Sequence, residues 1–79
     1  MIAIIDYGCG NLFSLSSSLE SLGIDCKITS NKAEIEAADK IILPGVGAFA
    51  DAAKKLKDSG LGQLVCDLAA TGKPILGIC

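Results

Sequence analysis

The chain has 79 residues, 51% of them hydrophobic, with a net charge of −2 and no histidine. This length supports one small domain or part of a larger one, and the apolar content is high for a free-standing chain of this size. Because the sequence has no arginine and no apolar run of the roughly 18 residues that a membrane span needs, we expect neither nucleic acid nor a membrane as partner.

The first third of the chain predicts a strand, a helix and a second strand. Residues 2–5 form a continuous apolar run that ends at a glycine-containing turn, which is typical of a buried strand. Four leucines then recur at helical spacing between a plausible N-cap at Asn11 and a plausible terminator at Gly23. The alternation over residues 24–28 predicts the second strand.

The middle of the chain predicts a short helix and a third strand. An acidic helix over residues 32–37 follows the second strand, with Asn31 or Ser30 as its N-cap. Residues 40–43 form the next apolar run, and the segment 44–47, Pro-Gly-Val-Gly, ends it.

The last third predicts two helices and a fourth strand. The first helix begins at Phe49 and is ended by Gly60, and its charged residues, from Asp51 to Asp58, are expected to form an exposed face. The second is amphipathic from Leu61 up to Gly72, and the apolar segment 74–78 follows as a strand.

Strands that alternate with helices at this spacing indicate right-handed crossovers and a parallel sheet. We therefore assign the α/β class, with a flavodoxin-like open sheet of order 2-1-3-4, and treat residues 1–79 as one incomplete domain. In this order the third and fourth strands are neighbours about 4.8 Å apart, with their carboxyl ends side by side. The 44–47 loop is then expected beside Cys79, and the 8–10 loop at the same edge.

The cysteines, at positions 9, 26, 66 and 79, have neither C-x-x-C spacing nor histidine companions, so no metal site is expected. No positively charged leader precedes the first strand, and we place the chain in the cytoplasm, where thiols stay reduced, although disulfides remain formally possible. Cys26 and Cys66 are expected to be buried core residues. The glycines at 8 and 10 lack the third glycine of a dinucleotide fingerprint, so no cofactor is expected, and they form either a tight turn or a backbone surface for a ligand or partner.

Cys79 directly follows an apolar strand, where the chain should turn sharply into a helix. A side chain at such a turn is lifted clear of the sheet, as in nucleophile elbows. The loop that contains Val46 and Gly47 is either a stiff connection or a source of backbone N–H groups for an oxyanion hole. Since a nucleophile needs a proton-transfer partner and the sequence has no histidine, we interpret the chain as one half of a catalytic unit.

Three segments together, residues 5–12, 43–49 and 74–79, resemble the amino-terminal portion of a class I glutamine amidotransferase. Within that family the chain is most similar to the glutaminase subunits of imidazole glycerol phosphate synthases. Related amidotransferases typically carry a Gly-Gly-Pro type of loop where this chain has Pro-Gly-Val-Gly. The resemblance covers the whole chain and somewhat under half of the usual subunit.

This resemblance implies that Cys79 is the nucleophile that attacks the side-chain amide of glutamine. Val46 and Gly47 match the loop that stabilises the oxyanion, and Asn11 matches a residue near the contact with a (β/α)8-barrel cyclase subunit. The released ammonia would serve formation of imidazole glycerol phosphate in histidine biosynthesis. The Leu-Gly-x-Gln segment and the later histidine and glutamate of the family are absent, which implies that this chain alone is inactive.

Two alternatives stay open at this point. A non-catalytic flavodoxin-like module could use its sheet edge for binding or association, and a thiol-based hydrolase of another kind could use the same turn. In either case a domain that lacks part of its cover exposes apolar surface, so the chain is expected to self-associate.

Overall fold

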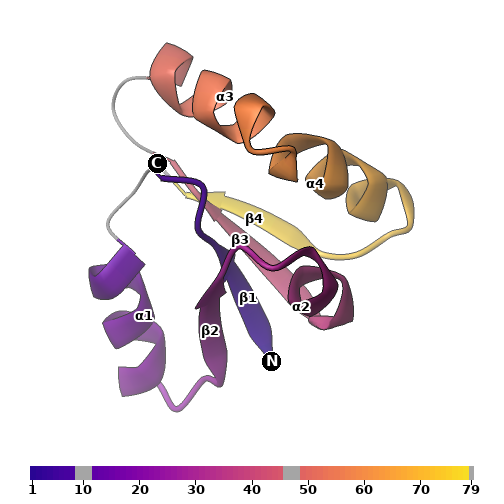
Figure 1. Cartoon of the computed structure of the whole chain (residues 1–79). Coiled ribbons are helices and arrows are strands. Elements are labelled where there is room, and N and C mark those ends of the chain that lie inside the picture. Colours follow the sequence, from indigo (N-terminus) through magenta and orange to yellow (C-terminus); the bar gives the residue numbers. More distant parts are fainter. Residues whose placement is uncertain (9–11, 46–48, 79) are drawn as a thin grey trace.

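The computed structural model describes residues 1–8, 12–45 and 49–78; for residues 49–53 and 78 it describes the backbone and not the side chains. In this part of the chain the elements follow the order β1-α1-β2-α2-β3-α3-α4-β4 (Figure 1). The strands are β1 (Ile2–Ile5), β2 (Cys26–Thr29), β3 (Lys40–Pro44) and β4 (Ile75–Ile78). The helices are α1 (Leu12–Ser21), α2 (Lys32–Ala37), α3 (Phe49–Asp58) and α4 (Leu61–Ala70).

The sheet is parallel and has the order β2-β1-β3-β4, which confirms the predicted α/β class and strand order. The chain moves in one direction from β1 to β2 and in the other direction from β2 to β3 and on to β4. Right-handed crossovers therefore place α1 on one face of the sheet and the other three helices on the opposite face, as Figure 1 shows.

The core lies between the sheet and the helices α2 and α4. Alternate residues of β1, Ala3 and Ile5, meet Ile41 of β3, Ile35 of α2 and Leu61 of α4 there, all of them buried. Strands of a parallel sheet that is covered on both faces read as continuous apolar runs, which is why β1 shows no polar alternation.

The second strand begins two residues later than predicted because Ile24 belongs to the capping motif that follows α1. Gly23 adopts a φ of +76° and its N–H donates to the Glu20 carbonyl at 2.9 Å, while the Ile24 N–H donates to the Leu19 carbonyl at 3.0 Å. These two bonds form a Schellman motif, which ends the helix at Ser21. Leu22 consequently leaves the apolar helical face on which its spacing had placed it, and its side chain is 73% exposed.

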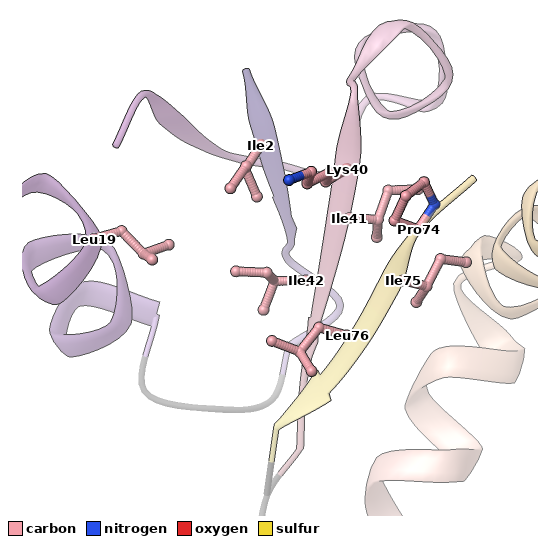
Figure 2. A pocket seen from close by; sticks show the side chains of 8 residues that line it. All are labelled: Ile2, Leu19, Lys40, Ile41, Ile42, Pro74, Ile75 and Leu76. Carbon is pink, nitrogen blue, oxygen red and sulfur yellow. The ribbon is translucent and has the colours of Figure 1, made fainter. Parts of the chain in front are cut away.

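The face that carries α1 is only partly covered. A groove of about 250 Å³ opens between α1 and the β3–β4 half of the sheet, and it is mostly apolar. Figure 2 shows Leu19 of α1, Ile42 of β3 and Leu76 of β4 pointing into it. Because Leu76 is 57% exposed on an outer strand, this face supports the prediction of an incompletely covered domain.

Two contacts fasten the amino edge of the sheet, the edge at which the strands begin. The Lys73 ammonium donates to the carbonyls of Glu36 and Ala38 at the end of α2. The amino group of Met1 lies 2.6 Å from Asp39 Oδ2. The hydrogen bond between them raises the pKa of the amine and lowers that of the carboxyl.

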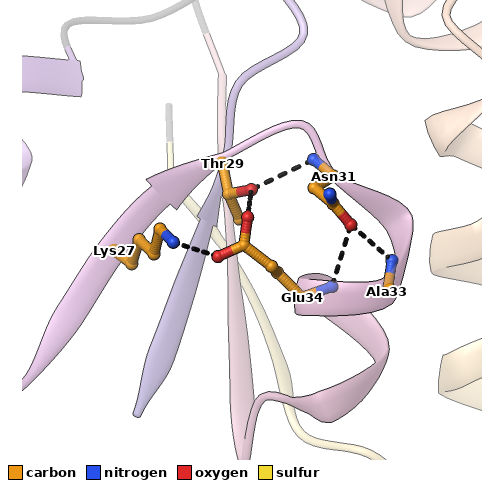
Figure 3. A network of polar contacts seen from close by, with 5 residues as sticks. All are labelled: Lys27, Thr29, Asn31, Ala33 and Glu34. Carbon is orange, nitrogen blue, oxygen red and sulfur yellow. Dashed lines mark hydrogen bonds and ion pairs between the residues drawn. The ribbon is translucent and has the colours of Figure 1, made fainter.

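A polar network joins the end of β2 to the start of α2 (Figure 3). Asn31, rather than Ser30, is the N-cap, because its Oδ1 accepts the N–H groups of Ala33 at 2.9 Å and Glu34 at 3.2 Å. The Glu34 carboxylate forms an ion pair with Lys27 and accepts the Thr29 hydroxyl at 3.1 Å. The hydrogen bond from Lys27, followed by that from Thr29, lowers the pKa of Glu34.

We predict that Asn31→Ala lowers the free energy of unfolding by about 1 kcal/mol, since it leaves two N–H groups of α2 without their cap. Urea denaturation followed by circular dichroism measures the change. The neighbouring Ser30→Ala is the control and should stay within about 0.5 kcal/mol of the parent. Equal losses for the two variants would contradict the capping role.

We also predict that the stabilising effect of Glu34 depends on pH. The folded state lowers the pKa of this carboxyl, so its contribution is fully present above the ordinary glutamate pKa, about 4.3, and is lost as the pH falls through the lower folded value. Urea titrations from pH 7 to 3 should show Glu34→Gln less stable than the parent at neutral pH, with the difference closing in acid. Glu36→Gln removes the same charge from the same helix and is the control. A difference that does not change with pH would contradict the prediction.

Candidate active site

The pairing of β3 with β4 brings the proposed reacting segments to one place at the carboxyl edge of the sheet, where the strands end. Pro44, the last residue of β3, pairs with Ile78, the last residue of β4. In the sequence Cys79 directly follows Ile78, and Val46 and Gly47 come two and three residues after Pro44. These three residues and Asn11 lie outside the described residues, so their roles remain predictions.

The turn after β1 lies at the same edge. The Asp6 N–H donates to the Thr29 carbonyl at 3.0 Å, which continues the pairing of β1 with β2 by one residue. The Gly8 N–H donates to Asp6 Oδ1 at 3.3 Å, and Gly8 has a φ of +91°. Since side chains rarely adopt this left-handed conformation, the turn requires glycine at position 8. The role of the 8–10 loop as a backbone surface for a ligand or partner stays a prediction.

Tyr7 connects this turn to the end of β3. Its side chain is buried, and its hydroxyl donates a hydrogen bond to the Pro44 carbonyl. Sequence reasoning gave Tyr7 no role, although one signal was present. A tyrosine that follows a buried strand is itself expected to be buried, and a buried tyrosine hydroxyl usually finds a hydrogen-bond partner.

Lys55 of α3 also contacts the turn after β1. Its ammonium donates to the Gly8 carbonyl at 3.3 Å. The described charged residues of α3, Lys54, Lys55, Lys57 and Asp58, are exposed as predicted. Helical periodicity predicts the exposure of Lys55 but not its hydrogen bond to the Gly8 carbonyl.

The two cysteines with described side chains differ from the expectation of buried thiols. Cys26 is half-buried, with its Sγ 3.9 Å from the Ser16 hydroxyl. Cys66 is exposed, so the prediction of a core position is wrong for it. The inward face of α4 is formed by residues 61, 64, 65 and 68, and position 66 is turned away from that face by the helical repeat.

Neither metal ligands nor a membrane span are found in the described part of the chain. No group of three or more His, Cys, Asp or Glu residues among those described could hold a metal ion. Of the described helices, none combines the length and the apolar character needed to cross a membrane.

Comparison with known proteins gives one consistent family. The glutamine amidotransferase class-I family matches residues 3–79. An imidazole glycerol phosphate synthase subunit HisH from Listeria monocytogenes (serotype 4a) is 52% identical over all 79 residues, which make up 38% of that protein. The subunits of the same name from Moorella thermoacetica and Oceanobacillus iheyensis are 51% and 52% identical, over 99% and 100% of this chain and 37% and 39% of their own lengths. The chain therefore spans less than two fifths of these curated relatives.

We predict that Gly8→Ala lowers the free energy of unfolding by about 1 to 2 kcal/mol, the cost of a side chain in a left-handed conformation. Among the described residues, an added Cβ would come within 4 Å of the Lys55 side chain alone, at 3.8 Å, so the expected loss comes from the backbone conformation. Gly77→Ala in β4 is the matched control, because no described atom lies within 4 Å of its added Cβ. We expect this variant to be at least as stable as the parent. Chemical denaturation measures both, and equal losses would contradict the turn assignment.

Proposed function

Because this chain belongs to the class-I glutamine amidotransferase family, we propose that residues 1–79 form the amino-terminal portion of a glutaminase domain. The domain would hydrolyse glutamine and supply ammonia for the formation of imidazole glycerol phosphate in histidine biosynthesis. About 50% identity to subunits named for imidazole glycerol phosphate synthase, over the whole chain, supports this function. The pairing of Pro44 with Ile78 is the structural observation that carries the proposal.

In the proposed reaction the thiolate of Cys79 attacks the side-chain amide carbon of glutamine. A carbon–sulfur bond forms, the carbonyl oxygen takes the negative charge, and the N–H groups of Val46 and Gly47 stabilise it. Collapse of this intermediate breaks the carbon–nitrogen bond and releases ammonia after a proton reaches the nitrogen. Water then attacks the thioester, which gives glutamate and restores the thiol.

The proton transfers need groups that the 79 residues do not supply. The sequence contains no histidine, the usual partner of a cysteine nucleophile. We therefore propose that this chain alone has negligible glutaminase turnover, and that the general base belongs to the part of the subunit that corresponds to the remainder of its relatives.

The proposed partner is a (β/α)8-barrel cyclase subunit that forms a heterodimer with the glutaminase and consumes its ammonia. The names of the relatives describe them as subunits of a synthase, which supports a partner of this kind. We assign its contact to the turn after β1, with Asn11 as an interface residue. We place the assembly in the cytoplasm, where free thiols such as Cys26 and Cys66 stay reduced.

A second proposal, association through the sheet, is favoured by one observation. The apolar groove that contains Ile42 and Leu76 is open in the single chain. If the 79 residues act alone as a non-catalytic module, this face would let the chain self-associate.

The test of the glutaminase is a fusion of residues 1–79 to the part of the Listeria relative that follows the matched region. We predict that this fusion releases ammonia from glutamine and that Cys79→Ser lowers kcat at least about 1,000-fold, as loss of a catalytic nucleophile does. Cys66→Ser, which removes an exposed thiol on α4, is the matched control and should retain activity. Mass spectrometry should show a diazo-ketone analogue of glutamine attached to Cys79 and to no other cysteine.

Three outcomes would contradict the proposal. A folded fusion whose ammonia release is unaffected by Cys79→Ser would remove Cys79 from the chemistry. Turnover by residues 1–79 alone, lost on Cys79→Ser, would show that the base does not have to come from elsewhere. A folded but inactive fusion, together with a concentration-dependent oligomer of the 79-residue chain, would favour the association module instead.

A further inference from the structure

We infer that Tyr7 is a positioning residue for the loop that follows β3, acting through the hydrogen bond that its hydroxyl donates to the Pro44 carbonyl. The inference rests on the proposed function, because this loop carries the proposed oxyanion donors Val46 and Gly47. Tyr7 would not contact glutamine. Its role is to set the direction in which the backbone leaves the sheet.

A hydrogen bond to the Pro44 carbonyl can orient the start of the loop because the peptide group is planar. This carbonyl and the Gly45 N–H belong to one planar peptide group, so holding the oxygen also fixes the direction of that N–H. Pro44 itself is buried, has a fixed φ and pairs with Ile78. Glycine follows at positions 45 and 47, where the backbone has the most freedom. The peptide group held by Tyr7 therefore directly precedes the peptide group of the first proposed donor, Val46.

Tyr7 can fix the Pro44–Gly45 peptide group because its own side chain and backbone are fixed by core packing and hydrogen bonds. Its side chain is 8% exposed and belongs to the core cluster with Ala3 and Ile5. The backbone on either side is fixed by hydrogen bonds, from the Asp6 N–H to Thr29 at 3.0 Å and from the Gly8 N–H to Asp6 at 3.3 Å. A phenol ring has only two side-chain torsions, so little entropy is lost when it acts as a fixed donor.

The helix that follows the loop, α3, contacts the same turn after β1. Lys55 lies on α3, the helix that follows the loop, and its ammonium donates to the Gly8 carbonyl at 3.3 Å. Residues 7 and 8 thus contact both the strand before the loop and the helix after it. Lys55 is exposed and its bond is in contact with solvent, so the buried bond of Tyr7 is expected to be the stronger constraint.

The expected consequence is a loss in the chemical step. Oxyanion donors act only at about 2.7 to 3.1 Å from the charged oxygen, and a displacement of about 1 Å can lower the rate about 100-fold. Because this interaction forms in the transition state, a mispositioned loop lowers kcat and changes KM much less.

The first experiment uses the fusion enzyme described above. Tyr7→Phe keeps the buried ring and removes only the hydroxyl, and it should lower kcat about 10- to 100-fold while KM stays within about twofold. Thr29→Val is the matched control, because it removes another buried hydroxyl at the carboxyl edge, one that donates to Glu34 and accepts the Asn31 N–H and does not contact Pro44. This control should keep the parental kcat per folded molecule. A Tyr7→Phe enzyme with parental kcat, or one whose activity falls only in step with the folded fraction, would overturn the inference.

The second experiment uses the 79-residue chain and does not depend on activity. In ¹⁵N NMR spectra, Tyr7→Phe should shift the amide signals of Gly45 and Gly47 and speed their hydrogen exchange about tenfold or more, while those of Ala3 and Ile4 in β1 stay as in the parent. Unchanged Gly45 and Gly47 amides would overturn the positioning role. An inactive parent fusion would instead count against the proposed function, and the NMR result would still decide the role of Tyr7.

Discussion

The pairing of β3 with β4 is the constraint on which the proposed chemistry depends. Parallel strands end at the same edge of a sheet, and the match of Pro44 with Ile78 leaves no offset between the two ends. A shift of one residue would turn the side chains of β4 to the opposite faces and remove Ile75 from the core against which it packs. The observed register sets the starting points of the segments that lead to Val46 and Cys79.

Local signals in the sequence are sufficient for most of the fold. Apolar runs and helical spacing depend on near neighbours, so they predict the class and Asn31 as one of two possible caps, whereas the strand order came from the common flavodoxin-like arrangement. The sequence does not show at which residue a helix ends, so the second strand was predicted to begin two residues too early and Leu22 was placed on the apolar helical face. Cys66 was misplaced because its apolar sequence neighbours do not share its side of α4. The contact of Tyr7 with Pro44 joins residues 37 positions apart, and no spacing rule specifies which carbonyl a buried phenol will reach.

The two faces of the sheet are covered unequally, and the handedness of the crossovers explains why. Among the described elements, α2, α3 and α4 lie on one face because the chain moves in the same direction from β2 to β3 and from β3 to β4, whereas α1 lies on the other. Further right-handed crossovers in that direction would add helices only to the face that is already covered. The groove beside Leu76 therefore needs a segment that runs back across the sheet, or another chain. This requirement agrees with relatives that are more than twice as long as the match.

Both edges of the sheet use the same device, a side-chain donor that binds a backbone carbonyl at the end of an element. Lys73 binds the last carbonyls of α2 at the amino edge, and Tyr7 binds the last carbonyl of β3 at the carboxyl edge. The reason differs between the two edges. At the amino edge the bond completes a helix end, which otherwise leaves carbonyls without partners. At the carboxyl edge it holds the last peptide group of β3, from which the proposed oxyanion loop, with glycine at positions 45 and 47, begins. The proposed oxyanion role would require the segments on either side of this loop to be held in place, and residues 7 and 8 contact both the strand before it and the helix after it.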